Sequence, residues 1–248
     1  MLELLAVAAA GAAAGFVNSV AGGGALITFP TLVALGLPPL SANVTLTVGI
    51  VPASAGGALG YLDLLREQRE RLVGLLAPLF LGALAGSAAL LLTSDAAFEA
   101  IVPALVAASC MLLLLQPRLT PRISHAGNER SPFLLGGIAF CGAYGAYFGA
   151  AVSILILAIL ALFVVDTLQH LNGMKILLAG GANLFAAVVY AFLAPVEWRY
   201  ALTIMVFSFV GGRVGAHYAR RIPSDPLRIA TATIGLMVAA VLAVRAFG

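Results

Sequence analysis

Eight long apolar segments dominate this 248-residue chain and constrain what it can fold into. Most have 19 to 24 residues, the length at which a helix rising about 1.5 Å per residue crosses a hydrocarbon core of about 30 Å. Strand-like alternation is missing, which disfavours a transmembrane barrel. We therefore predict an all-α, polytopic integral membrane protein of the cell membrane. The segments are 2–35, 43–62, 71–92, 97–115, 132–165, 170–193, 197–219 and 226–247.

Composition agrees with a membrane protein and excludes several classes of function. With 62% hydrophobic and 9% charged residues and a mean hydropathy of +1.09, the chain cannot cover a soluble globule with polar side chains. The net charge of +3 is small and lies in loops, so we expect no nucleic-acid partner. We also expect no cofactor, no metal site and no disulfide, and we read Cys110 and Cys141 as buried small side chains.

Segments 2–35 and 132–165 are each 34 residues long and overshoot the bilayer. As single helices they would extend about 51 Å, more than tilting comfortably absorbs. Backbone that leaves helical geometry at membrane depth persists only where protein, water or solute satisfies its polar groups. We predict that both segments break or bend back at their central glycines and that the first break is half of a solute site. These glycines are Gly22, Gly23, Gly24, Gly142, Gly145 and Gly149.

Polar residues recur at a fixed spacing in the two halves of the chain. Asn43 and Asn172, Ser54 and Asn183, and Tyr61 and Tyr190 are each separated by 129 residues. On a regular helix Asn43, Thr47 and Ser54 share one face within about 40°, as do Asn172 and Asn183. We therefore predict two four-segment repeats, 1–115 and 132–248, joined by a polar linker, 116–131, that we expect on the cytoplasmic side.

Loop charges indicate how the halves are oriented. Arg66, Arg69 and Arg71 follow the polar-striped segment of the first half, whereas in the second half the basic residues come one loop later, at Arg220, Arg221 and Arg228. If basic loops face the cytoplasm, the halves are inverted relative to each other. Eight single crossings with parallel halves remain the alternative.

Lys175 is the single lysine and lies within an apolar segment. An ionisable side chain there is costly, by roughly 2.5–3.5 kcal/mol, and marks a functional pathway by default. With Asn172 one turn before it and Asn183 two turns after it, an anion site is the sharper interpretation. The alternative is that Lys175 extends to the membrane interface.

Other polar residues have two interpretations each. A set of polar residues is expected to line the site, although Ser and Thr in membrane helices more often bond to their own backbone: Asn18, Ser19, Thr28, Thr45 and Thr47. Asp166 and His170, at i and i+4, form either a proton relay or an interfacial ion pair. The glycine triplet either presents free amides at a helix N-terminus, which suit an anion, or allows close helix packing.

The motifs together resemble the sulfite exporter TauE/SafE family of membrane permeases over essentially the whole chain. In the first half they are Gly22-Gly23-Gly24, GLPP at 36–39 and Asn43-x-Thr45, and in the second LNGMK at 171–175 and GGRVGAHYARRIP at 211–223. The resemblance implies transport of small sulfur-containing or carboxylate anions, such as sulfite, sulfoacetate or related organosulfonates. One departure is Gly149-Ala150-Ala151, where many members have a second glycine cluster.

We therefore expect a transporter of small anions working by alternating access, with export favoured. Gly22, Gly23 and Gly24 would offer backbone amides, Asn43 and Asn172 would orient the oxyanion, and Lys175 would neutralise it, with Thr47 and Asn183 in the same site. A proton-coupled uptake permease and an anion channel are alternatives. We expect no enzyme or scaffold, since a catalytic set of side chains is missing from the sequence. The oligomeric state stays open, including a homo-oligomer.

Overall fold

The computed structural model describes residues 1–119, 131–218 and 224–247, and in those ranges it contains helices and no strand. This confirms the all-helical prediction. Most of the predicted linker, 120–130, lies outside the described residues. The helices of the described part are α1 (Leu2–Val20), α2 (Ala25–Ala34), α3 (Pro39–Ala58), α4 (Leu62–Glu67), α5 (Arg69–Leu92), α6 (Asp95–Leu119), α7 (Pro132–Tyr147), α8 (Val152–Phe163), α9 (Leu168–Leu193), α10 (Trp198–Tyr218) and α11 (Ser224–Phe247).

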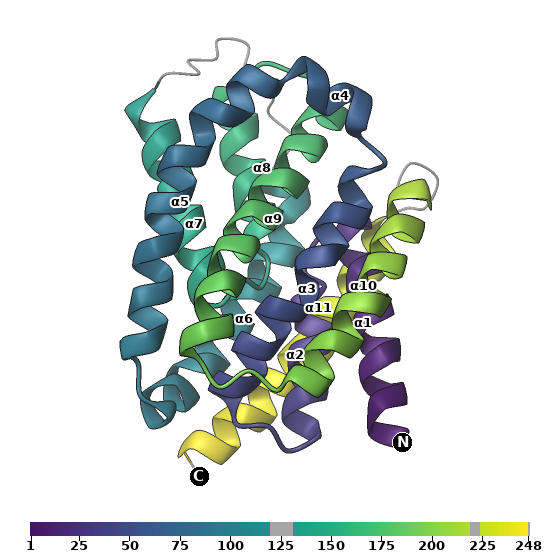
Figure 1. The fold of residues 1–248 in the computed structure, drawn as a ribbon, viewed down its shortest axis with the longest axis vertical. Coiled ribbons are helices and arrows are strands. Elements are labelled where there is room, and N and C mark those ends of the chain that lie inside the picture. Colours follow the sequence, from purple (N-terminus) through teal and green to yellow (C-terminus); the bar gives the residue numbers. More distant parts are fainter. Residues whose placement is uncertain (120–130, 219–223, 248) are drawn as a thin grey trace.

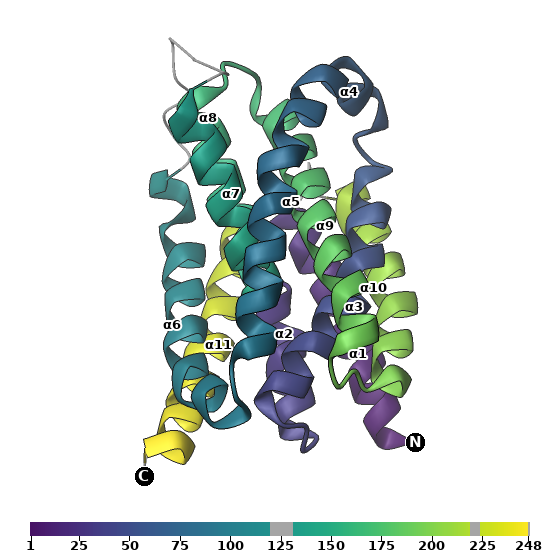
Figure 2. The same cartoon turned by 60° about the vertical axis from the view of Figure 1, so that its left-hand side comes forward.

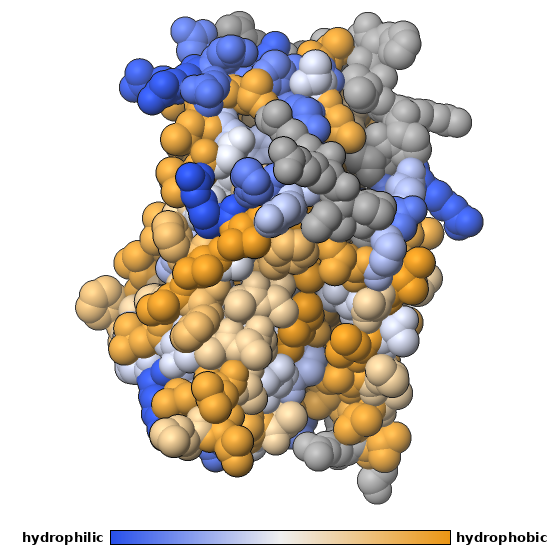
Figure 3. All heavy atoms as spheres, turned by 90° about the vertical axis from the view of Figure 1, so that its right-hand side faces the viewer, coloured by the Kyte–Doolittle hydropathy of each residue, from blue (hydrophilic) through white to orange (hydrophobic). Residues whose placement is uncertain are grey.

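The protein is a multi-pass integral membrane protein. Within the described ranges, α1, α5, α6, α9 and α11 contain spans long and apolar enough to cross a bilayer, while α2, α7 and α8 are shorter apolar helices. Large apolar side chains such as Leu81, Phe140 and Phe192 are exposed on the outside of the bundle. Figure 3 shows this apolar surface over most of one face, with hydrophilic residues gathered at the upper end.

Two pairs of consecutive helices enter the bundle from opposite ends. In Figures 1 and 2, α1 rises from the N-terminus and α2 runs back toward the same lower end, whereas α7 descends from the upper end and α8 returns to it. We call these pairs hairpin 1 (α1 and α2) and hairpin 2 (α7 and α8). Their tips, 21–24 and 148–151, lie inside the bundle, because the residues there are mostly buried.

The first helix of each hairpin packs against a helix from the other half of the chain. α1 packs on α10 and α7 packs on α5. Glycine makes both contacts close: a Cβ on Gly211 of α10 would overlap the carbonyl oxygen of Ala12, and one on Gly82 of α5 would overlap that of Ala139. Small residues let membrane helices approach in this way. The two contacts therefore tie the halves together.

The remaining helices surround the hairpins. α3 and α9 contact each other and, respectively, α10 and α5, while α11 lies against α2 and α6, and α6 against α8. The short helix α4 and the start of α5 lie at the upper end with the connection from α8 to α9, and both chain termini lie at the lower end (Figure 1). Hence the two hairpin tips meet between α3 and α9.

Candidate functional site

The tip of hairpin 1 is a short non-helical turn. α1 ends at Val20 and α2 begins at Ala25, and between them Gly22 and Gly23 have φ of 86° and 83°. These positive values are open to glycine at little cost, whereas other residues are strained there. A Cβ on Gly22 would lie 2.9 Å from Ser153 Oγ in hairpin 2. Glycine is thus required both for the turn and for the close approach of the two tips.

The tip of hairpin 2 is also a short non-helical turn, with two glycines fewer. α7 ends at Tyr147, α8 begins at Val152, and both Gly149 and Ala151 have positive φ, of 74° and 63°. For Ala151 this left-handed conformation costs of order 1–3 kcal/mol, and strain of this kind clusters at functional sites. The departure seen in the sequence, alanine in place of glycine, therefore leaves a strained turn rather than a continuous helix.

Each tip exposes backbone N–H groups that have no acceptor in the described part of the chain. They belong to Gly23, Gly24 and Ala25 at the start of α2, and to Ala150, Ala151 and Ser153 at the start of α8. Neither helix has a side-chain cap. Free amides at a helix N-terminus, together with the positive end of the helix dipole, suit an anion.

A small buried cavity lies where the two tips meet α3 and α9. Its volume is about 20 Å³, a little more than one water molecule needs. A solute of several heavy atoms therefore fits only if the tips or the neighbouring helices move apart. The cavity is lined by Asn18, Gly23, Ala25, Leu46, Thr47, Ile50, Phe148, Gly149, Ala151, Val152, Ser153, Ala179 and Asn183.

Five of the residues singled out in the sequence line this cavity: Asn18, Gly23, Thr47, Gly149 and Asn183. Asn183 is 7% exposed and forms no hydrogen bond within the ranges that the structure describes, so its amide is available to a solute. Thr47 Oγ1 donates a hydrogen bond to the carbonyl oxygen of Asn43 at 2.8 Å. The lone pairs of the Thr47 hydroxyl therefore remain available to accept a hydrogen bond. Gly22 and Gly24 flank the cavity, and Gly24 packs against the carbonyl of Ala14.

Asn43 and Asn172 lie outside the cavity lining. Asn43 is fully buried, and its Nδ2 donates to the carbonyl oxygen of Tyr147 at 2.9 Å, directly before the tip of hairpin 2. Its Oδ1 is buried without a partner in the described chain. Asn43 therefore holds the tip of hairpin 2 from α3. Asn172 is half-buried near the upper end of α9.

Lys175 is buried but does not line the cavity. Its side chain is 2% exposed, and it makes no ion pair or hydrogen bond with any described residue. It precedes Ala179 of the cavity wall by one helical turn, and it lies about 12 Å along the α9 axis from Asn183. Buried charges are ordinarily paired. The arrangement therefore leaves a cation without a protein partner between the cavity and the upper end of the bundle.

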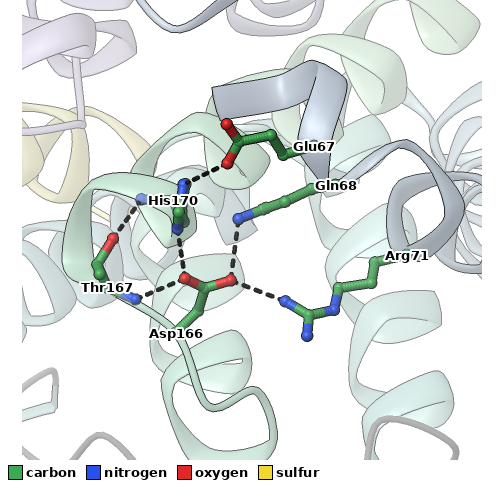
Figure 4. Close-up of polar contacts among 6 residues, drawn as sticks. All are labelled: Glu67, Gln68, Arg71, Asp166, Thr167 and His170. Carbon is green, nitrogen blue, oxygen red and sulfur yellow. Dashed lines mark hydrogen bonds and ion pairs between the residues drawn. The ribbon is translucent and has the colours of Figure 1, made fainter. Parts of the chain in front are cut away.

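Asp166 and His170 lie at the upper end, in a polar cluster that joins the two halves (Figure 4). Asp166 Oδ2 accepts hydrogen bonds from Arg71 Nη1 at 2.7 Å and Gln68 Nε2 at 3.0 Å, and Oδ1 contacts His170 Nδ1. His170 Nε2 is 3.5 Å from a carboxylate oxygen of Glu67. The cluster connects the start of α5 to the start of α9.

The charge of Asp166 is stabilised by these neighbours. Burial opposes ionisation, but the hydrogen bonds from His170 and Thr167 and the positive charges of His170 and Arg71 outweigh it, so the pKa of Asp166 lies below its ordinary value. The carboxylate therefore stays ionised at neutral pH. Within the described residues, no group of three His, Cys, Asp or Glu side chains could hold a metal ion.

The cavity residues that sequence reasoning missed include Ser153 and Phe148. Ser153 is 4% exposed and stands 129 residues after Gly24, so the repeat spacing was a signal that could have found it. Phe148 contacts Phe29 and Phe98, with ring centroids 5.6 and 6.4 Å away. This aromatic contact depends on the hairpin turn, which local sequence does not specify.

Comparison with known proteins gives one family and several relatives. The family profile described as "Sulfite exporter TauE/SafE" matches residues 7–242. The chain is 29% identical over 211 residues to "Probable membrane transporter protein ORF9" of Sinorhizobium sp, covering 83% of this chain and 79% of that protein. It is 27% identical over 210 residues to "Probable membrane transporter protein YfcA" of Escherichia coli strain K12, covering 82% and 76%. A "Probable membrane transporter protein" of Haemophilus influenzae is 28% identical over 220 residues, covering 87% and 85%.

Proposed function

We infer the function of this chain from its membership of the sulfite exporter TauE/SafE family of membrane transporters. We propose that it moves a small anion, sulfite or an organosulfonate, by alternating access. The observation that carries the proposal is the meeting of two uncapped helix N-termini at one buried cavity. Of the six residues with unpaired amides, Gly23, Ala25, Ala151 and Ser153 line that cavity. Discontinuous helices whose N-termini point at a midplane solute are a recurring device of transporters.

Inverted repeats are part of this proposal, and the packing pattern supports them. The main helix contacts of one half have counterparts in the other: α1 packs on α10 as α7 packs on α5, and α2 packs on α11 as α8 packs on α6. The corresponding helices are α1 and α7, α2 and α8, α3 and α9, α5 and α10, and α6 and α11. The two hairpins also enter from opposite ends (Figure 2). We propose that the units 1–115 and 132–248 are these repeats.

In the proposed site, backbone amides from both tips and the amide of Asn183 bind the oxyanion. Asn43 acts indirectly, since it holds Tyr147 at the edge of tip 2. Lys175 contributes a positive charge one turn beyond the cavity wall, where it draws an anion between the cavity and the upper end. Gly22 lets the two tips approach each other closely, and Gly24 lets the start of α2 pack against Ala14 of α1.

Export is the favoured direction. An inside-negative membrane potential drives each exported negative charge by about 2.3 kcal/mol per 100 mV, so no coupling ion is required. Proton-coupled uptake is the second candidate, because His170 bridges Asp166 and Glu67 at the upper end and offers a protonatable group there. A channel with the same amide-lined site is the third, and turnover rates distinguish it from a transporter.

The test is anion flux in proteoliposomes that contain the purified protein. Sulfite, thiosulfate, sulfoacetate, sulfate and simple carboxylates are screened, each with and without a pH gradient. We expect flux of sulfite or an organosulfonate that Asn183→Ala reduces at least about tenfold. Gly136→Ala is the matched control, because a Cβ there meets nothing within 4 Å. Flux no greater than in empty liposomes for every anion would refute the proposal.

A further inference from the structure

The two hairpin tips supply a definite amount of positive charge to the cavity. A helix N-terminus is equivalent to about half an elementary charge. The N-termini of α2, with 10 residues, and α8, with 12 residues, both reach the cavity through residues that line it. Together they compensate about one negative charge. We propose that the cavity selects singly charged anions over doubly charged ones, a selectivity that rests on the proposed anion transport.

The lining side chains add dipoles to this charge and no ionised group. Asn183 and Ser153 are 7% and 4% exposed, line the cavity, and have no hydrogen-bond partner in the described ranges. Their N–H and O–H groups can therefore donate to an oxyanion without breaking an existing contact. Two unpartnered, buried polar groups at one cavity are an observation independent of the helix termini, and they indicate a polar ligand.

The apolar part of the cavity wall suits an uncharged part of the same solute. It includes Leu46, Ile50 and Phe148. Thr47 Oγ1 already donates to Asn43, so toward the cavity it can only accept a hydrogen bond. A negatively charged oxygen would be repelled at this wall, whereas a methyl group or a protonated oxygen fits it. Methanesulfonate and hydrogensulfite have this two-sided character, and sulfate and sulfite dianions do not.

Lys175 does not line the cavity and adds no ionised group to its wall. Side chains on a helix lean toward its N-terminus, which for α9 is the upper end of the bundle, away from Asn183. The ammonium group therefore acts on the approach to the cavity. A dianion inside would keep about one charge uncompensated in a low-dielectric interior, and we expect it to bind at least about a hundredfold more weakly than a monoanion.

The experiment is competition against labelled sulfite flux in proteoliposomes of the wild-type protein at one fixed pH. Methanesulfonate and sulfate are the competitors, since both present sulfonyl oxygens but carry one and two charges. We expect methanesulfonate to inhibit at a concentration at least about a hundredfold below that of sulfate. In parallel, the current under a potassium and valinomycin clamp is expected to show one charge moved per sulfite.

The results separate this inference from the function on which it rests. Equal inhibition by the two competitors, or two charges moved per sulfite, overturns monoanion selectivity and leaves anion transport standing. Failure to detect flux of any anion overturns both. Inhibition by methanesulfonate alone, with one charge per sulfite, supports both.

Discussion

Replacing Lys175 by methionine should stabilise the protein and at the same time impair transport. The ammonium group is 2% exposed and lacks a partner among the described residues, so the folded protein bears most of the cost of burying it. Insertion scales place that cost at about 2.5–3.5 kcal/mol, and because Lys175 is only two turns into α9 we expect a gain of about 2 kcal/mol from Lys175→Met. Methionine matches lysine in length and helix propensity, so the backbone is unaffected.

Stability is measured as the midpoint of unfolding in detergent, and transport as sulfite flux in proteoliposomes. We expect a raised midpoint together with flux lowered at least about tenfold, because the charge that draws the anion is gone. Arg69→Met is the matched control: it also removes a cation, but from an exposed position, and should change neither quantity appreciably. A Lys175→Met protein that is less stable, or that transports normally, would refute this reasoning.

Three further predictions concern the packing and the polar contacts. Gly82→Ala should destabilise the protein by about 1–3 kcal/mol, since its Cβ would overlap Ala139, whereas Gly74→Ala on the same helix meets nothing and should be neutral or stabilising by up to about 1 kcal/mol in detergent unfolding. The pKa of Asp166 is lower in the folded protein than in the unfolded one, so its contribution to folding stability is complete above about pH 4 and is lost as the pH falls further. In an unfolding titration against pH, the wild type should therefore lose stability below about pH 4 more steeply than Asp166→Asn. Asn43→Ala should cost about 1–3 kcal/mol by leaving the Tyr147 carbonyl unpaired, and equal stability of the two proteins would show that this contact is unimportant.

The helical membrane fold could be predicted because the length and composition of most apolar segments are enough to indicate a membrane helix. Segments such as 71–92 and 170–193 correspond closely to α5 and α9, where length and composition alone decide. The short helix α4 was not expected, because its six residues, Leu62–Glu67, continue an apolar segment into a charged loop without a clear boundary. The local sequence pattern therefore predicts the long helices better than the short connecting segments between them.

The candidate site could be predicted only in part, because contacts with residues distant in the sequence decide which side chains of a helix reach the cavity. The polar face of α9 was recognised, but Asn183 lines the cavity and Lys175 does not, and the difference arises from where the hairpin tips end. Similarly, the partner of Asn43 is the carbonyl of Tyr147, 104 residues away. A helical period places these side chains on a face and says nothing of such pairings.

The central claim, that an anion binds between the two hairpin tips, is tested most directly by a density map of the protein recorded with selenite, the electron-rich analogue of sulfite. We expect strong density between the backbone at Gly23 and that at Ala151, within hydrogen-bonding distance of the Asn183 amide. Density for bound selenite elsewhere, with the tips still in contact, would contradict it.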